Sequence, residues 1–306
     1  MLVVNKAARM VVHPSAGHER GTLVNAVLHH CALPAMRVQA GAAPRAGLLP
    51  EEEDEGEEAL EDEDEEAPAP LLALPHSGAQ TVLRPGIVHR LDKGCAAPLR
   101  AHRPRQLTPP GCRSTSGLLV VAKNAAAHAH LCAQFSARQV HRRYEALHLG
   151  APSPPHGRVE APVGRDPTNR LRMAVVWAPG ARGARAAASR YEQLEALGRG
   201  GCSRVAWRLE TGRTHQVRVH ARHLGMPLLG DPLYGGSAGA LMAALLRQGV
   251  LRAVATALAE GTPQDRPCLH AAELGFTHPA TGEAMSFRVQ PPPDFLAVLE
   301  QLRALH

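Results

Sequence analysis

Short aliphatic and β-branched runs predict most of the regular structure in this chain. Runs of this length, bounded by turn residues, are typical of strands. We expect strands at residues 2–4, 10–12, 86–88, 118–122, 144–149, 189–195, 205–210 and 283–289, with further short strands between 158 and 173. Apolar residues spaced three and four apart predict helices at 23–30, 125–138, 215–223 and 295–305. Because the strands outnumber the helices and do not alternate strictly with them, the pattern favours an α+β fold.

Three stretches interrupt this pattern within what we interpret as one domain over residues 1–306. Residues from about 35 to 80 are rich in Ala, Pro and Gly and then acidic, so we expect a disordered insertion there. Residues 95–114 are proline-rich and aperiodic, which predicts a loop insertion. A third, Ala/Leu-rich insertion runs from about 237 to 265, and its residues 238–259 form either a helix or a loosely ordered segment.

The net charge of +6 combines two very different parts of the chain. Residues 51–66 hold 13 of the 28 acidic side chains and no Lys or Arg. The remainder has 34 basic against 15 acidic residues, a net charge of +19. A polyanion is therefore the partner that this charge favours.

Other bulk features limit the class of protein. The six cysteines contain no C-x-x-C pair and follow no zinc-ligand spacing, so we expect a reducing, intracellular compartment. No run approaches eighteen apolar residues, which excludes a membrane span, and we expect a monomer without membrane contact. The first residues, MLVVNKAARMVVHP, indicate a strand and not a transit peptide, so either no presequence is needed or the true start lies upstream of Met1.

Two clusters of basic residues hold candidate chemistry. In RPGIVHRLDKG, Asp92 lies beside His89, Arg90 and Lys93, and neighbouring cations favour an ionised carboxylate that acts as nucleophile or base. The alternative is an ordinary surface ion pair. In LETGRTHQVRVHARHLGMPLLGDPLYGG, Arg213 stands at a turn where a bidentate guanidinium suits a carboxylate or phosphate. A solvated basic helix face is the alternative there.

Further polar residues carry weaker signals. In RRYEALHLG, Tyr144 begins a strand and could stack on a base or accept a proton, or simply be a half-buried aromatic. Three histidines, His215, His220 and His223, are set among arginines without a carboxylate, which makes a poor metal cage. His270 and His278 flank an apolar strand, and we interpret both as structural or capping groups.

In combination, these segments resemble the RluA-type family of pseudouridine synthases. The family joins HRLD closely to TSGLLVVAK, and here HRLDKG ends at Gly94 and TSGLLVVAKN begins at Thr115. The blocks RRY, TGRTHQVRVH, LGDPLYGG and LHAAELGFTHP follow in the family's order, and NKAARMVVHP resembles its NKPAGMVVHP. The resemblance implies the pseudouridine synthase fold, a mixed and mostly antiparallel sheet with flanking helices and a central active-site cleft.

The resemblance also implies a reaction and the residues that perform it. The family isomerises uridine in RNA to pseudouridine by detaching uracil, turning it and rejoining it through carbon 5, without a metal or other cofactor. By this likeness Asp92 is the essential aspartate, Arg213 its basic partner and Tyr144 the tyrosine that packs on the target base. The same likeness puts Arg90 near a flipped nucleotide, and we expect His89, Lys93, Gln216 and Arg218 to assist RNA binding or base flipping.

Two departures from the family leave alternatives open. Residues 95–114 separate Asp92 from Thr115, either as a surface excursion or as a retained intronic segment, and an inactive RNA-binding relative is the alternative to an enzyme. No separate amino-terminal RNA-binding domain is expected. We expect ribosomal RNA as the substrate, with transfer RNA as the second candidate, and a location in the cytoplasm or, if a presequence is missing, in a chloroplast or mitochondrion. A metal hydrolase is a third function, which the lack of carboxylate partners opposes.

Overall fold

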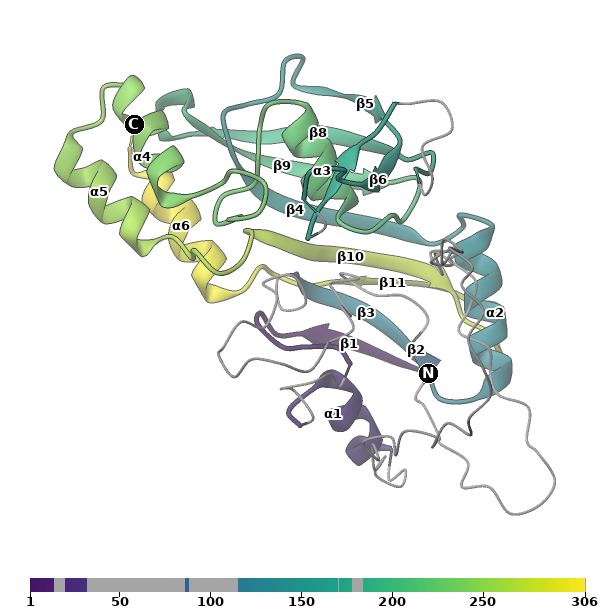
Figure 1. The fold of residues 1–306 in the computed structure, drawn as a ribbon. Coiled ribbons are helices and arrows are strands. Elements are labelled where there is room, and N and C mark those ends of the chain that lie inside the picture. The colour runs from purple at the N-terminus through teal and green to yellow at the C-terminus, as the bar shows by residue number, and fades with distance from the viewer. Residues whose placement is uncertain (14–19, 32–85, 88–114, 170, 178–183, 306) are drawn as a thin grey trace, which may run out of the picture.

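The computed structural model describes residues 1–13, 20–31, 86–87, 115–169, 171–177 and 184–305. Within them, nine strands form one sheet in the order β1-β3-β10-β4-β9-β8-β5, with β2 beside β3 and β11 beside β10 (Figure 1). Every pair in this sheet is antiparallel except β3 with β10. The α+β class and the mostly antiparallel sheet are thereby confirmed.

The bounds of the elements follow the chain order. The strands are β1 (Leu2–Lys6), β2 (Gly86–Ile87), β3 (Ser116–Ala122), β4 (His141–Leu149), β5 (His156–Glu160), β6 (Val163–Arg165), β7 (Met173–Val175), β8 (Ala188–Leu197), β9 (Cys202–Leu209), β10 (Leu269–Thr277) and β11 (Ala284–Arg288). The helices are α1 (Leu23–His30), α2 (Ala125–Ser136), α3 (Gln216–His223), α4 (Ala238–Arg247), α5 (Arg252–Gly261) and α6 (Pro293–Arg303), with one 3₁₀ turn at Gly198–Gly200.

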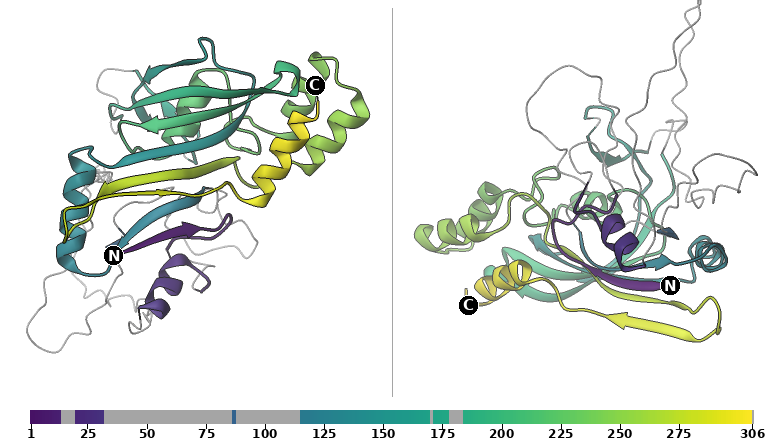
Figure 2. Two further views of the ribbon diagram at one scale, coloured as in Figure 1. Left: turned by 180° about the vertical axis from the view of Figure 1, so that it is seen from behind. Right: turned by 90° about the horizontal axis from the view of Figure 1, so that it is seen from below.

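Helix α3 lies between the sheet and a small hairpin of β6 and β7. Its Val217 and Ala221 pack with sheet residues, whereas Val219 packs with Val163 and Met173 of the hairpin. Helices α4, α5 and α6 gather at one end of the sheet and α2 lies at the other (Figure 2). This layering places the start of α3 over the same sheet face as the aromatic side chains of β4, β8 and β9.

The structure confirms most of the expected elements and corrects one. The predicted helix 23–30 is α1, and its capping box joins Thr22 and Asn25 through Asn25 N to Thr22 Oγ1 at 3.2 Å and Thr22 N to Asn25 Oδ1 at 3.0 Å. The strand predicted at 10–12 is wrong. The carbonyls of Val11 and Val12 instead accept hydrogen bonds from Leu23 N and Val24 N, so this segment supports α1 and not a sheet.

The Ala/Leu-rich stretch after residue 237 forms the two helices α4 and α5. Residues 238–259 are therefore mainly helical and not a loosely ordered segment. Leu241 and Leu245 of α4 and Leu258 of α5 are buried in one cluster with Phe295 and Leu299 of α6. Burial of these side chains stabilises the helix pair against the sheet end. The insertions expected at about 35–80 and at 95–114 lie outside the described residues. Among the helices that are described, none has the length and apolarity needed to cross a membrane.

His148 on β4 makes folding sensitive to acid. Its Nδ1 lies 2.7 Å from Met226 O, and its Nε2 accepts from Trp207 Nε1 at 3.0 Å. Complete burial lowers its pKa from 6.5 to about 4. Because the unfolded chain takes up a proton between these values and the folded one does not, lowering the pH from 6.5 to 4 costs about 3 kcal/mol of stability through this group.

Replacing His148 by Gln is therefore expected to reduce the loss in the free energy of unfolding between neutral pH and pH 4. The amide offers a donor and an acceptor but does not titrate in this range. Urea unfolding of both proteins at neutral pH and near pH 4, followed by tryptophan fluorescence, measures the difference. His30→Gln, at an exposed position on α1, is the control, and equal pH slopes for all three proteins would contradict this assignment.

Candidate functional site

Residues from four strands align across the centre of the sheet. Gly117 of β3 pairs with Ala271 of β10, which pairs with Tyr144 of β4, which in turn pairs with Trp207 of β9. A Cβ on Gly117 would lie 2.2 Å from Ala271 O, and the φ of Gly117 is +107°. Glycine is therefore required at this position for β3 and β10 to pair, and it fixes Thr115 and Ser116 at the start of β3.

The entry to β3 is further fixed by buried polar contacts. Thr115 and Ser116 are only 1% and 2% exposed, and Ser116 Oγ lies 3.0 Å from His270 Nδ1. His270 Nε2 lies 3.3 Å from Val289 O. His278 accepts from the N–H of Thr281 at 3.1 Å, so the structural interpretation of His270 and the capping interpretation of His278 are both confirmed.

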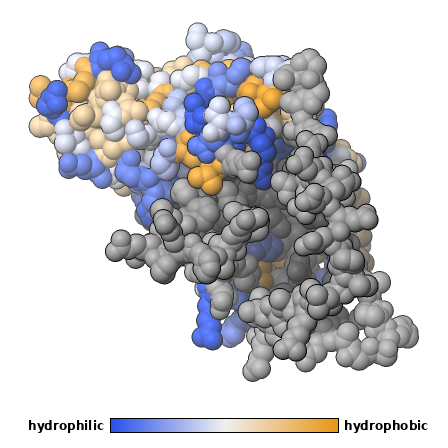
Figure 3. Space-filling model, viewed as in Figure 1, coloured by the Kyte–Doolittle hydropathy of each residue, from blue (hydrophilic) through white to orange (hydrophobic). Residues whose placement is uncertain are grey.

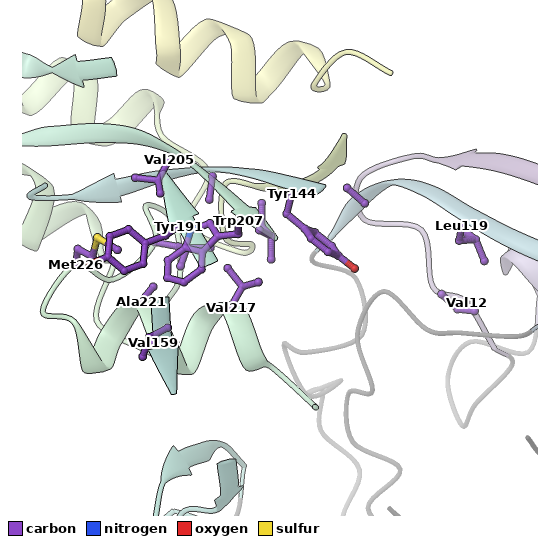
Figure 4. Close-up of a cluster of buried hydrophobic side chains, with 14 of the residues drawn as sticks. Val12, Leu119, Tyr144, Val159, Tyr191, Val205, Trp207, Val217, Ala221 and Met226 are labelled. Carbon is purple, nitrogen blue, oxygen red and sulfur yellow. The ribbon is translucent and has the colours of Figure 1, made fainter. Parts of the chain in front are cut away.

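Tyr144 lies at the boundary of the aromatic cluster. The residue is buried, and its ring belongs to the cluster that contains Tyr191, Trp207 and Val217. Figure 4 shows the hydroxyl of Tyr144 directed away from Tyr191 and Trp207. The rings of Tyr191 and Trp207 lie 5.7 Å apart, so the cluster forms a rigid support behind Tyr144.

Arg213 stands in the turn between β9 and α3, and Gln216 holds this turn in place. The side-chain oxygen of Gln216 accepts from Arg213 N at 2.8 Å and from Thr211 Oγ1 at 2.7 Å. Its amide nitrogen donates to Ala188 O and Ser189 Oγ, both at 2.9 Å. The guanidinium of Arg213 is half-buried, with Nε donating to Ala186 O at 3.2 Å. Arg213 O also accepts from Gln216 N at 3.0 Å, so both backbone groups of Arg213 are hydrogen-bonded to Gln216.

His215 begins α3 in a left-handed conformation, with φ of 55°. Its Nδ1 lies 2.9 Å from the hydroxyl of Tyr234, which accepts from Met173 N at 2.9 Å. Burial, and then the charges of Arg218 and Arg165, hold the pKa of His215 well below its usual value. A neutral His215 thus joins the turn of Arg213 to the β6–β7 hairpin.

A buried ion pair connects α3 to the LGDPLYGG segment. Arg218 Nε and Nη2 donate to Asp231 Oδ2 and Oδ1 at 2.7 and 2.8 Å, and both residues are at most 1% exposed. The guanidinium also lies 4.7 Å from the centre of the Tyr234 ring. Asp231 Oδ1 further accepts from Leu233 N at 3.1 Å. Two motifs that are separate in the sequence, TGRTHQVRVH and LGDPLYGG, therefore form one buried network.

The expected site residues differ in where the structure places them. Tyr144 packs in one cluster with Val217 of α3, and the Arg213 turn leads directly into that helix. Gln216 and Arg218, expected to contact RNA, are instead buried and bonded to other protein groups, because α3 turns this side toward β8 and residue 231. Four further candidates, Asp92, Arg90, His89 and Lys93, lie outside the described residues.

Sequence reasoning did not assign roles to Asp231, Tyr234 or Ser189, although each contacts a predicted residue. The signal for the first two was the LGDPLYGG segment, which follows the basic helix directly. The sequence of that segment does not show that Asp231 forms a buried ion pair, because an Asp after Gly is also typical of an ordinary turn. Ser189 has no sequence signal of its own.

The three histidines that the sequence offers as candidate metal ligands have other partners in the structure. His220 Nδ1 lies 2.9 Å from Ser189 Oγ and its Nε2 lies 3.0 Å from Ala161 O. His215 is bonded to Tyr234, and the ring of His223 lies 6.3 Å from that of Trp177. In the part of the chain that the structure describes, no group of three or more metal-binding side chains occurs.

Comparison with known proteins identifies the family. A family model for RNA pseudouridylate synthase matches residues 113–223. The chain is 46% identical to "RNA pseudouridine synthase 2, chloroplastic" of Arabidopsis thaliana, over 99% of this chain and 63% of that protein. It is 38% identical to "Ribosomal large subunit pseudouridine synthase D" of Zymomonas mobilis, over 99% of this chain and 70% of that protein.

A third relative gives the same result. "Ribosomal large subunit pseudouridine synthase D" of Pseudomonas aeruginosa is 36% identical over 99% of this chain and 69% of its own length. The chain spans less than two thirds of the length of the plant relatives from Arabidopsis thaliana and Oryza sativa, at 63% and 62%. Identity at this level over nearly all of the chain is family evidence, and the matched region contains Tyr144 and Arg213. The chain therefore belongs to the RluA-type family of RNA pseudouridine synthases.

Proposed function

We propose that this chain isomerises uridine in RNA to pseudouridine. The observation that carries the proposal is that Tyr144 packs in one cluster with Val217 of α3, the helix that follows the Arg213 turn directly, while β4 of Tyr144 and β3 flank β10. The described residues on either side of the Asp92 segment both lie at β3. Ile87 of β2 pairs with Val121 near the end of β3, and Thr115 directly precedes its start. Asp92 follows the end of β2 by five residues in the sequence.

The proposed reaction rearranges bonds within one nucleotide. The bond from uracil N1 to the anomeric carbon breaks and a bond from carbon 5 to that carbon forms, while carbon 5 loses a proton and N1 gains one. Asp92 supplies the carboxylate that attacks the nucleotide, and the Arg213 guanidinium keeps it ionised. The ring of Tyr144 packs on the base, and its hydroxyl assists removal of the proton from carbon 5. No oxidant or reductant is needed because the atoms balance.

We propose ribosomal RNA of the large subunit as the substrate class. The names of the Zymomonas and Pseudomonas relatives support this choice. Outside residues 51–66 the chain has a net charge of +19, which suits RNA phosphates and lowers the cost of extruding a base, about a few kcal/mol. The names of the two plant relatives also support a chloroplast as the compartment.

The substrate class is tested with transcripts of large-subunit ribosomal RNA and of transfer RNAs. Each is incubated with the protein, and pseudouridine is mapped by carbodiimide modification and primer extension. The proposal expects one or a few discrete positions in the ribosomal transcript. Modification confined to transfer RNA would overturn the choice of substrate while preserving the reaction, and Asp92→Asn serves as the inactive control.

Gln216 is expected to act as a positioning residue for Arg213. Removing its side chain in Gln216→Ala leaves Arg213 N and Ala188 O without these partners. A shift of about 1 Å in the turn costs about 100-fold in kcat, while KM for RNA stays near the wild-type value because phosphate contacts remain. Single-turnover kinetics measure both terms. Gln248→Ala, an exposed position after α4, is the control, and an unchanged kcat for Gln216→Ala would refute the role.

A further inference from the structure

One aromatic side chain is exposed where burial is the rule. The chain has two tryptophans, of which Trp207 is fully buried and Trp177 is 64% exposed. Trp177 follows β7, and its neighbour Val176 donates from its N–H to Pro162 O at 3.0 Å, so the backbone beside the ring is fixed. An exposed aromatic ring on a fixed backbone offers a face on which another flat ring can stack.

The ring of Trp177 meets the end of α3. Its centre lies 6.3 Å from that of His223, with the two planes inclined by 54°. His223 is itself exposed, and Leu224, which follows it, is 36% exposed. The pair of Trp177 and His223, here called the aromatic platform, thus has accessible ring surface next to solvent.

The charge beside the platform is positive. Helix α3 and residues 171–177 contain no acidic residue, and the charge of Arg218 on α3 is neutralised by its buried pair with Asp231. The nearby Asp166 is already bonded to Arg172 at 2.5 Å. Arg222 is exposed and has no ion pair among the described residues. Figure 3 shows mainly hydrophilic residues over α3 and the adjoining hairpin, with small hydrophobic patches among them. The platform therefore combines accessible aromatic rings with the positive charge of Arg222 on the same helix. This combination suits a partner that carries both negative charge and planar rings.

We infer that the aromatic platform stacks on an unpaired base of the RNA substrate, away from the nucleotide that reacts. This inference rests on the proposed function and adds a contact for RNA to it. Helix α3 begins beside the Arg213 turn and ends at His223, and its eight residues span about 12 Å. A base on the platform therefore belongs to a different nucleotide from the one at Tyr144. Stacking is tolerant of sequence because every base has an aromatic face.

The experiment uses Asp92→Asn protein, which binds without turnover, and a short oligouridylate as the probe. Trp177→Ala in this background is expected to weaken binding roughly 5- to 100-fold, whereas Trp177→Phe retains most of the affinity. Binding to the parent protein should also quench the fluorescence of the exposed tryptophan and leave that of Trp207 unchanged. Leu251→Ala, at a side chain 75% exposed between α4 and α5, is the control and should bind normally.

Arg222→Gln provides an independent readout. It should lower the slope of log affinity against log salt by about 0.7, the value for one phosphate contact with a single strand, while Trp177→Ala should leave the slope unchanged. Equal affinity of Trp177→Ala and the parent protein would overturn the inference. So would sedimentation showing that Trp177→Ala converts a dimer to a monomer, because the platform would then bind a second copy.

Failure of this inference is distinguishable from failure of the proposed function. Binding is measured without catalysis, so weaker oligouridylate binding by Trp177→Ala supports the platform even if no pseudouridine forms. Conversely, pseudouridine formation with unchanged binding by Trp177→Ala overturns the platform alone. Because the replaced side chain is exposed, the melting temperature should not change, and this is checked first.

Discussion

Asp92→Asn protein is expected to form no measurable pseudouridine. An amide has nearly the shape of the carboxylate but lacks the charged oxygen that attacks the nucleotide, so kcat should fall by about 10⁴-fold or more. The position lies outside the described residues, and the prediction rests on the HRLDKG motif and on the family. RNA affinity should remain within a few-fold because one acidic group among many basic ones contributes little to binding.

The measurement is a single-turnover reaction at saturating RNA, with the melting temperature as the check on folding. Asp92→Glu is a useful companion, because it retains the charge and displaces it by one methylene group. The account expects Asp92→Glu to be strongly impaired as well, since placement matters as much as charge. Activity of Asp92→Asn within tenfold of wild type would remove Asp92 from the mechanism.

Asp231→Ala is expected to cause the largest loss of stability. It leaves the Arg218 guanidinium buried without its carboxylate, and breaking a buried pair in this way costs about 3–5 kcal/mol. Since the pair also joins α3 to the segment after it, the Arg213 turn should lose its support and activity should fall with stability. Urea unfolding followed by tryptophan fluorescence gives the free energy of unfolding.

An exposed ion pair supplies the matched control. Arg9 Nε and Asp265 Oδ2 lie 2.7 Å apart, but their side chains are 50% and 58% exposed. Solvent screens such a pair, so Asp265→Ala should cost no more than about 1 kcal/mol. The double variant Arg218→Met, Asp231→Leu should recover part of the loss, because no charge then remains buried. If Asp231→Ala and Asp265→Ala were equally stable, the buried pair would not be a structural link.

Much of the fold was predictable because the spacing of apolar residues and the capping of helices depend on residues that are close together in the sequence. Helix α1 is specified by Thr22 and Asn25 with the apolar residues that follow, and β3 by its aliphatic run. Residues 10–12 show the limit of this reasoning. Val11 and Val12 look like strand residues, yet their carbonyls bind the start of α1, a choice that depends on tertiary contacts.

The site was predictable in type but not in detail. Arg213 and Tyr144 could be predicted because the segments that contain them resemble the family's motifs. Gln216 and Arg218 on α3 appear in the sequence as a basic, exposed helix face. They are buried because Ser189 and Asp231, distant in the sequence, satisfy their polar groups. The apolar residues Val217 and Val219 predict the helix, but its sequence does not show that Gln216 and Arg218 are buried with them. Only the structure separates the residues that position Arg213 from those that face RNA.

The most direct test of the central claim is release of tritium from ribosomal RNA labelled at carbon 5 of uridine. Formation of a bond at carbon 5 requires loss of the hydrogen there, so the wild-type protein should release tritium in a fixed molar ratio to RNA. Digestion of the same RNA should yield an equal amount of pseudouridine. Absence of both from every RNA tested, with the protein folded and bound to RNA, would contradict the assignment of this chain as a pseudouridine synthase.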